Sequence, residues 1–402
     1  MGEFLIILRK IKSLFHYKYI MGHAVGGKKF ALNNKKKASY LVVNGNSFQN
    51  ITSPCFFGER NENIVSAKLP EQYILQLKDA CIIGGSSVII CNTICRRRIL
   101  YDMLVTASSN VEVIDEALVR TRKPLHIKGL YFAYFKKKIN IPYGISLCVN
   151  FSWNYYHFIY ECLAKFYLIE KSSIPMSVPI LVDSVVRNVE SMKTLLSIFC
   201  KNRQIVYIDK YTKAHINTLY FPSNVNVLPP QIKDIRSVRA EDVVFDLTAL
   251  QYLRGKILEF GKNNEPSNLP KYRYIFISRK NRTNRAYNED EVVSVIKEFN
   301  YTIICPETLT VAEQIFVFSN ADYIVAASGA ALSNIICCKP GCKILVFSLR
   351  SKLSIFSTIA TAVGAELRYF PCTPLHKDNL QSPFTVNIQL LSETLPAFHG
   401  KR

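Results

Sequence analysis

The chain lacks the sequence signatures of most metal and cofactor sites. Its 12 cysteines include no CxxC pair, and its 7 histidines form no HxH or HExxH pattern. We therefore expect no zinc site, and since no secretory signal is apparent, we expect buried thiols in a reducing compartment. Neither a GxxxxGK[ST] loop nor a GxGxxG fingerprint occurs, which argues against nucleotide sites of the P-loop and dinucleotide types.

Long apolar runs are also missing. No stretch reaches about 18 apolar residues without a polar interruption, so no transmembrane helix is predicted. Residues 1–20 are apolar and basic, and two readings stay open for them: a segment lying on a membrane surface, or a packed terminal helix. The net charge of +21 indicates an anionic partner such as nucleic acid, an acidic membrane surface or a phosphate-bearing substrate.

Length and hydrophobic content predict two α/β domains. The 402 residues, 49% of them hydrophobic, suffice for two ordinary cores. Residues 40–130 are β-rich, and strands and helices alternate from 179 to 260 and again from 274 to 370. We expect a basic N-terminal segment (1–39), an N-terminal α/β domain (40–261) and a C-terminal α/β domain (262–402). The irregular tail of the chain is expected to pack back on the first domain.

The segment 323–347, YIVAASGAALSNIICCKPGCKILVF, is the clearest pattern in the chain. It predicts a strand, a loop of small residues, a short helix from Leu332 to Cys338, and a second strand. A small-residue loop that leads into a helix N-terminus favours anion binding, because free N–H groups and the helix dipole converge there. An ordinary βαβ crossover explains the same pattern without any ligand.

Basic residues follow the predicted strand 274–278. Arg279, Arg282 and Arg285 leave its end, as the loop at Ser328 leaves the end of a strand in the same predicted sheet. Ligands of open parallel sheets bind where strands end and helices begin. Guanidinium groups and helix-terminal N–H groups directed at one crevice fit a diphosphate.

A second concentration of polar chemistry is SWNYYHFIYECLAKFYLIE, residues 152–170. It predicts a helix beginning near Asn154. His157 and Glu161 are four residues apart and share one face of that helix. A helix docked on a sheet, with His157 as a core histidine, is the alternative interpretation.

Four motifs in order resemble glycosyltransferase family 61: NYYHFIYE, YIFISRKNRTNRAYNEDEV, PETLTVAEQI and ADYIVAASGAALSNIICCKPGCKILVF. The similarity covers roughly residues 80–350. It implies a GT-B architecture, in which two Rossmann-like domains face each other across a cleft. It also implies inverting, metal-independent transfer of a hexose or pentose from a nucleotide sugar, with no cofactor. The absence of any DxD motif agrees with metal independence.

The resemblance also implies roles for individual residues. His157 or Glu161 is the base on the acceptor side, and an unperturbed imidazole titrates near neutral pH, which favours His157. The expected donor-binding residues are Arg279, Arg285, Ser328, Gly329, Ala330, Glu313 and Glu307. Glu313 also fits a capping box with Thr310, which explains it without a ligand. Ser328 stands where the family pattern usually has histidine, so donor choice or rate is expected to differ.

The resemblance and the charge together predict a cytoplasmic enzyme, peripheral on the inner membrane face, that builds capsule or lipopolysaccharide. Its partners would be a nucleotide-sugar donor, a glycan or lipid-linked glycan acceptor and an anionic membrane surface. Two alternatives remain: a catalytically silent scaffold in polysaccharide assembly, and a basic nucleic-acid-binding protein. No nucleic-acid recognition motif is present, so no specific nucleic acid is expected.

Overall fold

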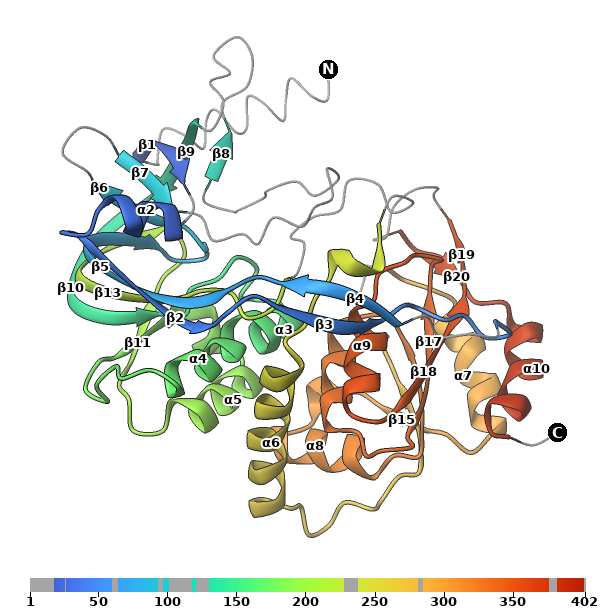
Figure 1. The fold of residues 1–402 in the computed structure, drawn as a ribbon. Coiled ribbons are helices and arrows are strands. Elements are labelled where there is room, and N and C mark those ends of the chain that lie inside the picture. The colour runs from blue at the N-terminus through green and yellow to red at the C-terminus, as the bar shows by residue number, and fades with distance from the viewer. Residues whose placement is uncertain are drawn as a thin grey trace. The chain divides into compact units, whose positions relative to one another are not determined.

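The computed structural model describes residues 18–25, 27–59, 64–92, 97–100, 118–120, 130–227, 238–280, 285–375 and 382–400. They form two compact units, whose elements are labelled in Figure 1. The first unit comprises the described residues of 18–46 and 70–225, and the second those of 47–69 and 226–400. Both units combine helices with β-sheets, which confirms the predicted α/β class at that level.

The first unit is built on one large mixed sheet. Its strands are β1 (Lys18–Val25), β2 (Ala38–Asn44), β5 (Gln72–Ile83), β6 (Ile89–Asn92), β7 (Arg97–Leu100), β8 (Leu118–Arg120), β9 (Leu130–Phe135), β10 (Lys137–Ser146), β11 (Ile180–Asp183), β12 (Ile205–Ile208) and β13 (Thr212–Pro222). Their order is β12-β11-β10-β13-β5-β6-β7-β1-β9-β8, and β2 also pairs with β5. The buried sides of β5 and β13 supply most of the core, with Leu75, Leu77 and Ile216 among its members.

Four neighbouring strands of this sheet, β12-β11-β10-β13, are parallel. Numbered along the chain, their order is 3-2-1-4, the order of half of a Rossmann sheet. The chain leaves β10 toward one side of the sheet and later returns on its other side as β13. The carboxyl end of β10 is therefore a topological switch point, and we call it the first-unit switch point.

The segment that follows β10 is helical but not one regular helix. It consists of α3 (Tyr155–His157), the π-turn η1 (Phe158–Cys162), the 3-10 turn η2 (Leu163–Lys165) and α4 (Phe166–Glu170). Phe158, Cys162 and Phe166 recur every four residues along this segment, and all three are buried. The other helical elements of the unit are α2 (Gly27–Asn33), η3 (Ser184–Asn188) and α5 (Glu190–Cys200).

The second unit contains a five-stranded, wholly parallel sheet. Its strands are β14 (Tyr274–Ile277), β15 (Thr302–Ile304), β16 (Tyr323–Ala327), β17 (Lys343–Ser348) and β18 (Glu366–Pro371). The order β15-β14-β16-β17-β18 is 2-1-3-4-5 along the chain, a doubly wound arrangement whose switch point lies between β14 and β16. We call the carboxyl ends of these two strands the second-unit switch point.

Helices pack around this sheet (Figure 1). They are η5 (Ala240–Asp242), α6 (Leu247–Asn263), α7 (Glu289–Glu298), η6 (Pro306–Thr308), α8 (Val311–Asn320), η7 (Ala330–Cys337), α9 (Ile355–Ala362) and α10 (Ile388–Phe398). Short strands complete the unit: β3 (Ser47–Thr52), β4 (Ile64–Leu69), β19 (Thr373–Pro374) and β20 (Phe384–Thr385).

The division into units differs from the predicted domain boundary at 261/262. Helix α6 packs against α8, η7 and α9, so it stands with the second unit. The hairpin β3–β4 also belongs there, because Thr52 bonds to α9: its N–H donates to Thr358 Oγ1 at 3.2 Å, and its carbonyl accepts from Ser357 Oγ at 2.6 Å. Hydrogen bonds across some 300 residues of sequence are invisible to a reading of local composition.

Three local predictions were wrong. The tail is not irregular: α10 buries Leu391, Leu395 and Phe398 in the core of the second unit. The helix predicted from Leu332 to Cys338 is the 3-10 helix η7, which begins earlier. The sequence also predicts a capping box of Asn288 with Glu291 at the start of α7, but the Asn288 side chain donates to the Val386 carbonyl and to Glu291 and does not cap the helix. Of residues 1–20, for which two readings were proposed, residues 1–17 lie outside the described residues, and Lys18 to Ile20 belong to strand β1 rather than to a helix.

Candidate functional site

The second-unit switch point brings Arg279 and Ser328 together, as the sequence predicted. Arg279 follows β14, and Ser328 follows the neighbouring strand β16. The guanidinium Nη1 of Arg279 donates to the carbonyl oxygen of Ser328 at 2.6 Å. The backbone of Ser328 is fixed in turn, because its N–H donates to the Phe347 carbonyl at 2.9 Å.

Gly329 makes room for this guanidinium. A Cβ at position 329 would lie only 2.0 Å from Arg279 Nη1. The backbone of Gly329 is extended (φ 177°), so conformational freedom does not explain the residue. Any larger side chain would displace Arg279 from Ser328. The small-residue loop predicted from the sequence thus leaves space for the Arg279 side chain. The next residue, Ala330, is the first residue of η7.

Arg285 adds a second cation to this place. Burial, together with the charge of Arg279, lowers the pKa of Arg285 to about 10. Within the described part of the chain, the buried Nε of Arg285 has no hydrogen-bond partner and no carboxylate forms an ion pair with this side chain. Its backbone is left-handed (φ 57°), a conformation that bulky residues adopt rarely and mostly at functional sites. Arg282 lies outside the described residues.

Glu289 holds the backbone of Arg279 in place. Both of its carboxylate oxygens accept from the Arg279 N–H at 3.0 Å, and the Ser278 hydroxyl also donates to it. Glu289 is the first residue of α7 and is buried. Sequence reasoning missed this role, although an acidic residue in the first turn of a helix after an arginine-bearing loop was visible.

The two other predicted carboxylates lie on the same edge of the sheet. Glu307 and Glu313 both follow β15, the strand beside β14. Glu313 completes the predicted capping box, and its Oε2 accepts from the N–H and the hydroxyl of Thr310 at 2.8 Å each. Glu307 is exposed in η6. The buried side chain of Asn334 donates to Gln314 Oε1 at 2.9 Å within the unit.

The first-unit switch point carries His157 and Glu161. His157 Nδ1 lies 3.0 Å from Glu161 Oε1, and their side chains are 18% and 15% exposed. Glu161 sits in the π-turn η1, whose wider hydrogen-bond pattern shifts side chains relative to a regular helix. Rings of Phe151 and Tyr156 flank the imidazole, with centroids 5.5 and 5.4 Å away. The predicted shared face is thus a real contact.

A buried carboxylate fixes the loop between β10 and this helix. Asp183, at the end of β11, accepts from Gly85 N at 2.6 Å and from Val149 N at 3.2 Å, and it also bonds the side chains of Ser152 and Cys148. Complete burial raises the pKa of Asp183 to about 6, although these donors favour its charged form. Sequence reasoning treated Asp183 only as the end of a strand.

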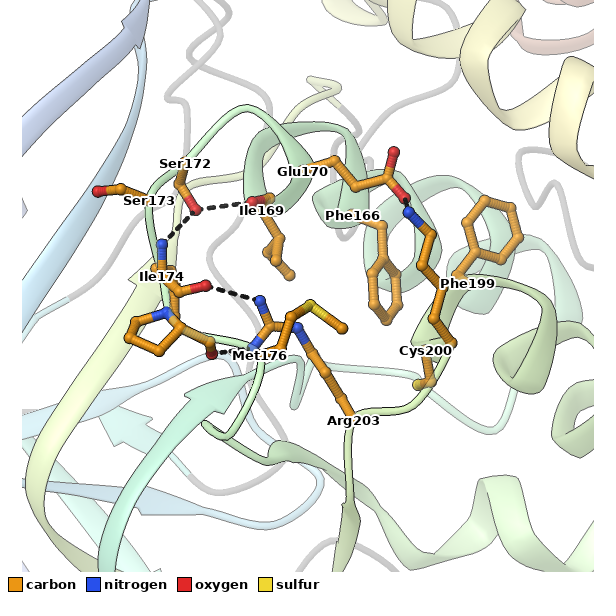
Figure 2. A pocket seen from close by; sticks show the side chains of 12 residues that line it. Phe166, Ile169, Glu170, Ser172, Ser173, Ile174, Met176, Phe199, Cys200 and Arg203 are labelled. Carbon is orange, nitrogen blue, oxygen red and sulfur yellow. Dashed lines mark hydrogen bonds and ion pairs between the residues drawn. The ribbon is translucent and has the colours of Figure 1, made fainter.

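A cavity of about 450 Å³ lies elsewhere in the first unit. It is formed by the connections from α4 to β11 and from α5 to β12, at the amino ends of these strands and so away from His157. Figure 2 shows Arg203 directed at the loop carbonyl of Ile174. Arg203 also donates to the carbonyl oxygen of Pro175 at 2.5 Å, and Lys201 Nζ lies 2.9 Å from Glu170 Oε1 in an ion pair. The arginine here stabilises a loop, and the cavity contains none of the predicted site residues.

Two kinds of feature are absent from the described residues. No three side chains of His, Cys, Asp or Glu gather there as metal ligands would. No helix in the described part has the length and apolar character needed to cross a membrane.

Residues 155–345 match the family model described as Glycosyltransferase 61, which confirms the resemblance. A search of the curated proteins found no match. The matched range begins at α3 and ends within β17, so it includes His157, Glu161, Arg279, Arg285 and Ser328. A match to this family indicates glycosyltransferase activity, with a sugar donor and a glycan acceptor as substrates.

Proposed function

We propose, from the resemblance to glycosyltransferase family 61 and from the two switch points, that this protein moves a hexose or pentose from a nucleotide sugar to a glycan acceptor. The donor binds at the second-unit switch point and the acceptor at the first-unit switch point. We further propose a GT-B arrangement, an inverting mechanism and independence of metal ions.

The observation that carries the proposal is the pair of guanidinium groups at the second-unit switch point. Arg285 is a half-buried cation, and no described carboxylate pairs with it; a diphosphate would supply the missing counter-charge. Arg279 uses one N–H on Ser328, and its fork has further donors for phosphate oxygens. Two cations can also offset the charge that develops on the leaving nucleoside diphosphate, as a metal ion does in other transferases.

The reaction is a single displacement. A base removes the proton from an acceptor hydroxyl as its oxygen attacks the anomeric carbon. The bond between that carbon and the donor diphosphate breaks, and the nucleoside diphosphate leaves with the electron pair. Attack from the side opposite the leaving group inverts the configuration of the anomeric carbon.

His157 is the base in this proposal, and Glu161 orients it. When Glu161 accepts from Nδ1–H, the proton is fixed on that nitrogen, and Nε2 keeps the lone pair that removes a proton. The flanking rings of Phe151 and Tyr156 restrict rotation of the imidazole. In the reverse assignment Glu161 is the base itself, and the two assignments differ in the variants described below.

Ser328 defines how this chain departs from the family pattern. Its hydroxyl is able to bond a phosphate or a ribose, but it cannot supply the cation of a histidine. In this proposal the positive charge that binds the donor at the second-unit switch point therefore comes from Arg279 and Arg285. Ala330, Glu313 and Glu307 are proposed to contact the ribose, sugar or base of the donor from the same sheet edge.

The setting that fits best is surface polysaccharide synthesis at the inner face of the cytoplasmic membrane. The net charge of +21 favours an anionic membrane surface, where lipid-linked acceptors are found. Capsule and lipopolysaccharide are the glycans proposed.

A thermal-shift screen against nucleotide sugars, with a metal chelator present, tests the proposal. A donor that binds only the folded state raises the melting temperature. Arg279→Gln should abolish most of the shift. Arg273→Gln is the matched control, because Arg273 precedes the same strand at its opposite end, where it pairs with Asp322 on the surface. No shift with any donor, or equal shifts in both variants, would contradict donor binding at this site.

A further inference from the structure

The single tryptophan of the chain lies on the surface beside the first-unit switch point. The side chain of Trp153 is 54% exposed, although tryptophan is among the residues buried most on average. It stands two residues after Phe151 and four before His157, in the loop that leads from β10 to α3. A single exposed apolar residue needs no explanation in itself. Whether Trp153 forms a binding surface therefore depends on how the residues around it hold it in place.

Phe151 links the exposed indole to the imidazole. Its ring meets Trp153 edge-on, with centroids 6.2 Å apart and planes at 87°, and it meets His157 at 5.5 Å. Phe151 itself has a left-handed backbone (φ 60°), which is strained for an aromatic residue. Strain of this kind persists only where the surroundings determine it, and it clusters at binding sites.

The loop that carries Trp153 is held rigidly at several points. Asp183 accepts from Val149 N and bonds Ser152, and the Ser87 hydroxyl accepts from Asn150 N at 2.9 Å. On the other side of Trp153, the Asn154 side chain caps α3 by accepting from Tyr156 N at 2.9 Å. An exposed ring fixed in this way has little freedom to lose when a ligand stacks on it.

From this arrangement we propose that Trp153 is a stacking platform for a pyranose ring of the acceptor glycan. One face of a pyranose presents C–H groups and is apolar, while its hydroxyls point outward at the rim. The flat, exposed indole of Trp153 can stack on the apolar C–H face, and the nearby His157–Glu161 pair can hydrogen-bond the hydroxyls at the rim. A ring seated on Trp153 lies near His157, because both side chains pack against Phe151.

This inference rests on the proposed function for the identity of the ligand, but its test does not depend on turnover. Because Trp153 is the only tryptophan, tryptophan fluorescence of the full chain reports this one position. The probes are methyl pyranosides of glucose, galactose, mannose and N-acetylglucosamine. Sorbitol, a polyol without a ring face, serves as the control for bulk effects.

We expect at least one pyranoside to shift the tryptophan emission to the blue with saturation, and sorbitol to leave it unchanged. Saturation-transfer NMR then compares variants with the same pyranoside. Trp153→Ala should lose at least about tenfold in affinity, as expected for one aromatic anchor, while Trp153→Phe retains part of the binding. Tyr143→Ala, which removes another exposed aromatic residue of the first unit, should bind as the wild type does.

The outcomes separate this inference from the proposed function. If no pyranoside changes the emission, or if Tyr143→Ala weakens binding as much as Trp153→Ala, the platform is refuted. Donor binding is measured independently by the nucleotide-sugar thermal shift, which Trp153→Ala should preserve. Pyranoside binding without any donor-induced thermal shift would support the Trp153 platform and contradict the proposed transferase. A donor-induced shift without pyranoside binding would support the transferase and contradict the platform.

Discussion

The two switch points occupy equivalent places in their sheets but carry opposite chemistry. The second-unit switch point carries Arg279, which packs against Gly329, and Arg285. The first-unit switch point has a buried carboxylate, Asp183, beneath a loop that bears aromatic rings and the His157–Glu161 pair. The two switch points thus carry different side chains, which fit the anion site proposed for one unit and the proton transfer proposed for the other. Topology decides where a ligand binds, and side chains at the strand ends decide which one.

The largest expected effect comes from removing the imidazole. His157→Ala should lower turnover by about 1,000-fold, the range of general-base catalysis. Glu161→Gln should lower it less, since an orienting residue leaves the base in place. Steady-state rates with saturating donor measure both variants. If Glu161→Gln is the more damaged of the two, the roles are reversed and Glu161 is the base.

Asp183 should make stability of the first unit depend on pH. Its folded pKa of about 6 lies above the ordinary value of 3.8, so the folded state binds more protons between these values. Unfolding free energy therefore falls as pH rises from about 4 to 6, by about 3 kcal/mol at about 1.4 kcal/mol per pKa unit.

Urea unfolding of wild type and Asp183→Asn across this pH range measures the effect. The variant is expected to be less stable overall, because an amide cannot accept all of the hydrogen bonds, but its profile should be flatter. Parallel profiles for the two proteins would show that Asp183 does not titrate in this window.

Arg285 in the second unit and Arg203 in the first should respond in opposite ways to an apolar substitution. Arg285→Leu removes a poorly compensated cation and should raise the unfolding free energy by about 1 kcal/mol while donor binding is lost. Arg203→Leu should lower it by about 3 kcal/mol, since Arg203 donates to the carbonyls of Ile174, Pro175 and Val178. Chemical denaturation without ligand compares them. Equal destabilisation would mean that Arg285 is a structural residue.

The smallest expected effect on the protein comes from Gly329, which leaves space for the Arg279 side chain. Gly329→Ala should leave the melting temperature nearly unchanged, because the flexible end of Arg279 can move aside, but it should weaken donor binding by about tenfold, as loss of one charge-assisted bond would. Gly255→Ala is the control: it lies exposed in α6 with open space around it and should stabilise the helix by about 1 kcal/mol. Unaltered donor affinity in Gly329→Ala would remove the reason given for this glycine.

Local sequence patterns predicted many helices and strands of the second unit. They predicted few of the contacts between residues that are distant in the sequence. The strands 274–277 and 323–327 were recognised from short apolar runs, and Thr310 with Glu313 from the capping box. Helix α10 was missed although Leu391, Leu395 and Phe398 have helical spacing, because Pro396 interrupts the pattern.

The strand orders could not be predicted, since pairing is decided by contacts between remote segments. For the same reason the sequence did not place the β3–β4 hairpin in the second unit. At the candidate sites, the contact of Arg279 with Ser328 was predictable from the ends of neighbouring strands, and that of His157 with Glu161 from their four-residue spacing. Glu289 and Asp183 were not found, because their importance lies in the backbone groups of other segments that they bind.

The division of labour between the two switch points is tested most directly by calorimetric titration of the nucleotide sugar that gives the largest thermal shift. Wild type, His157→Ala and Arg279→Gln are compared. The account predicts that His157→Ala binds the donor within about twofold of wild type, and that Arg279→Gln binds about 30-fold more weakly, the equivalent of about 2 kcal/mol. Equal affinities in wild type and Arg279→Gln, or loss of donor binding in His157→Ala alone, would contradict it.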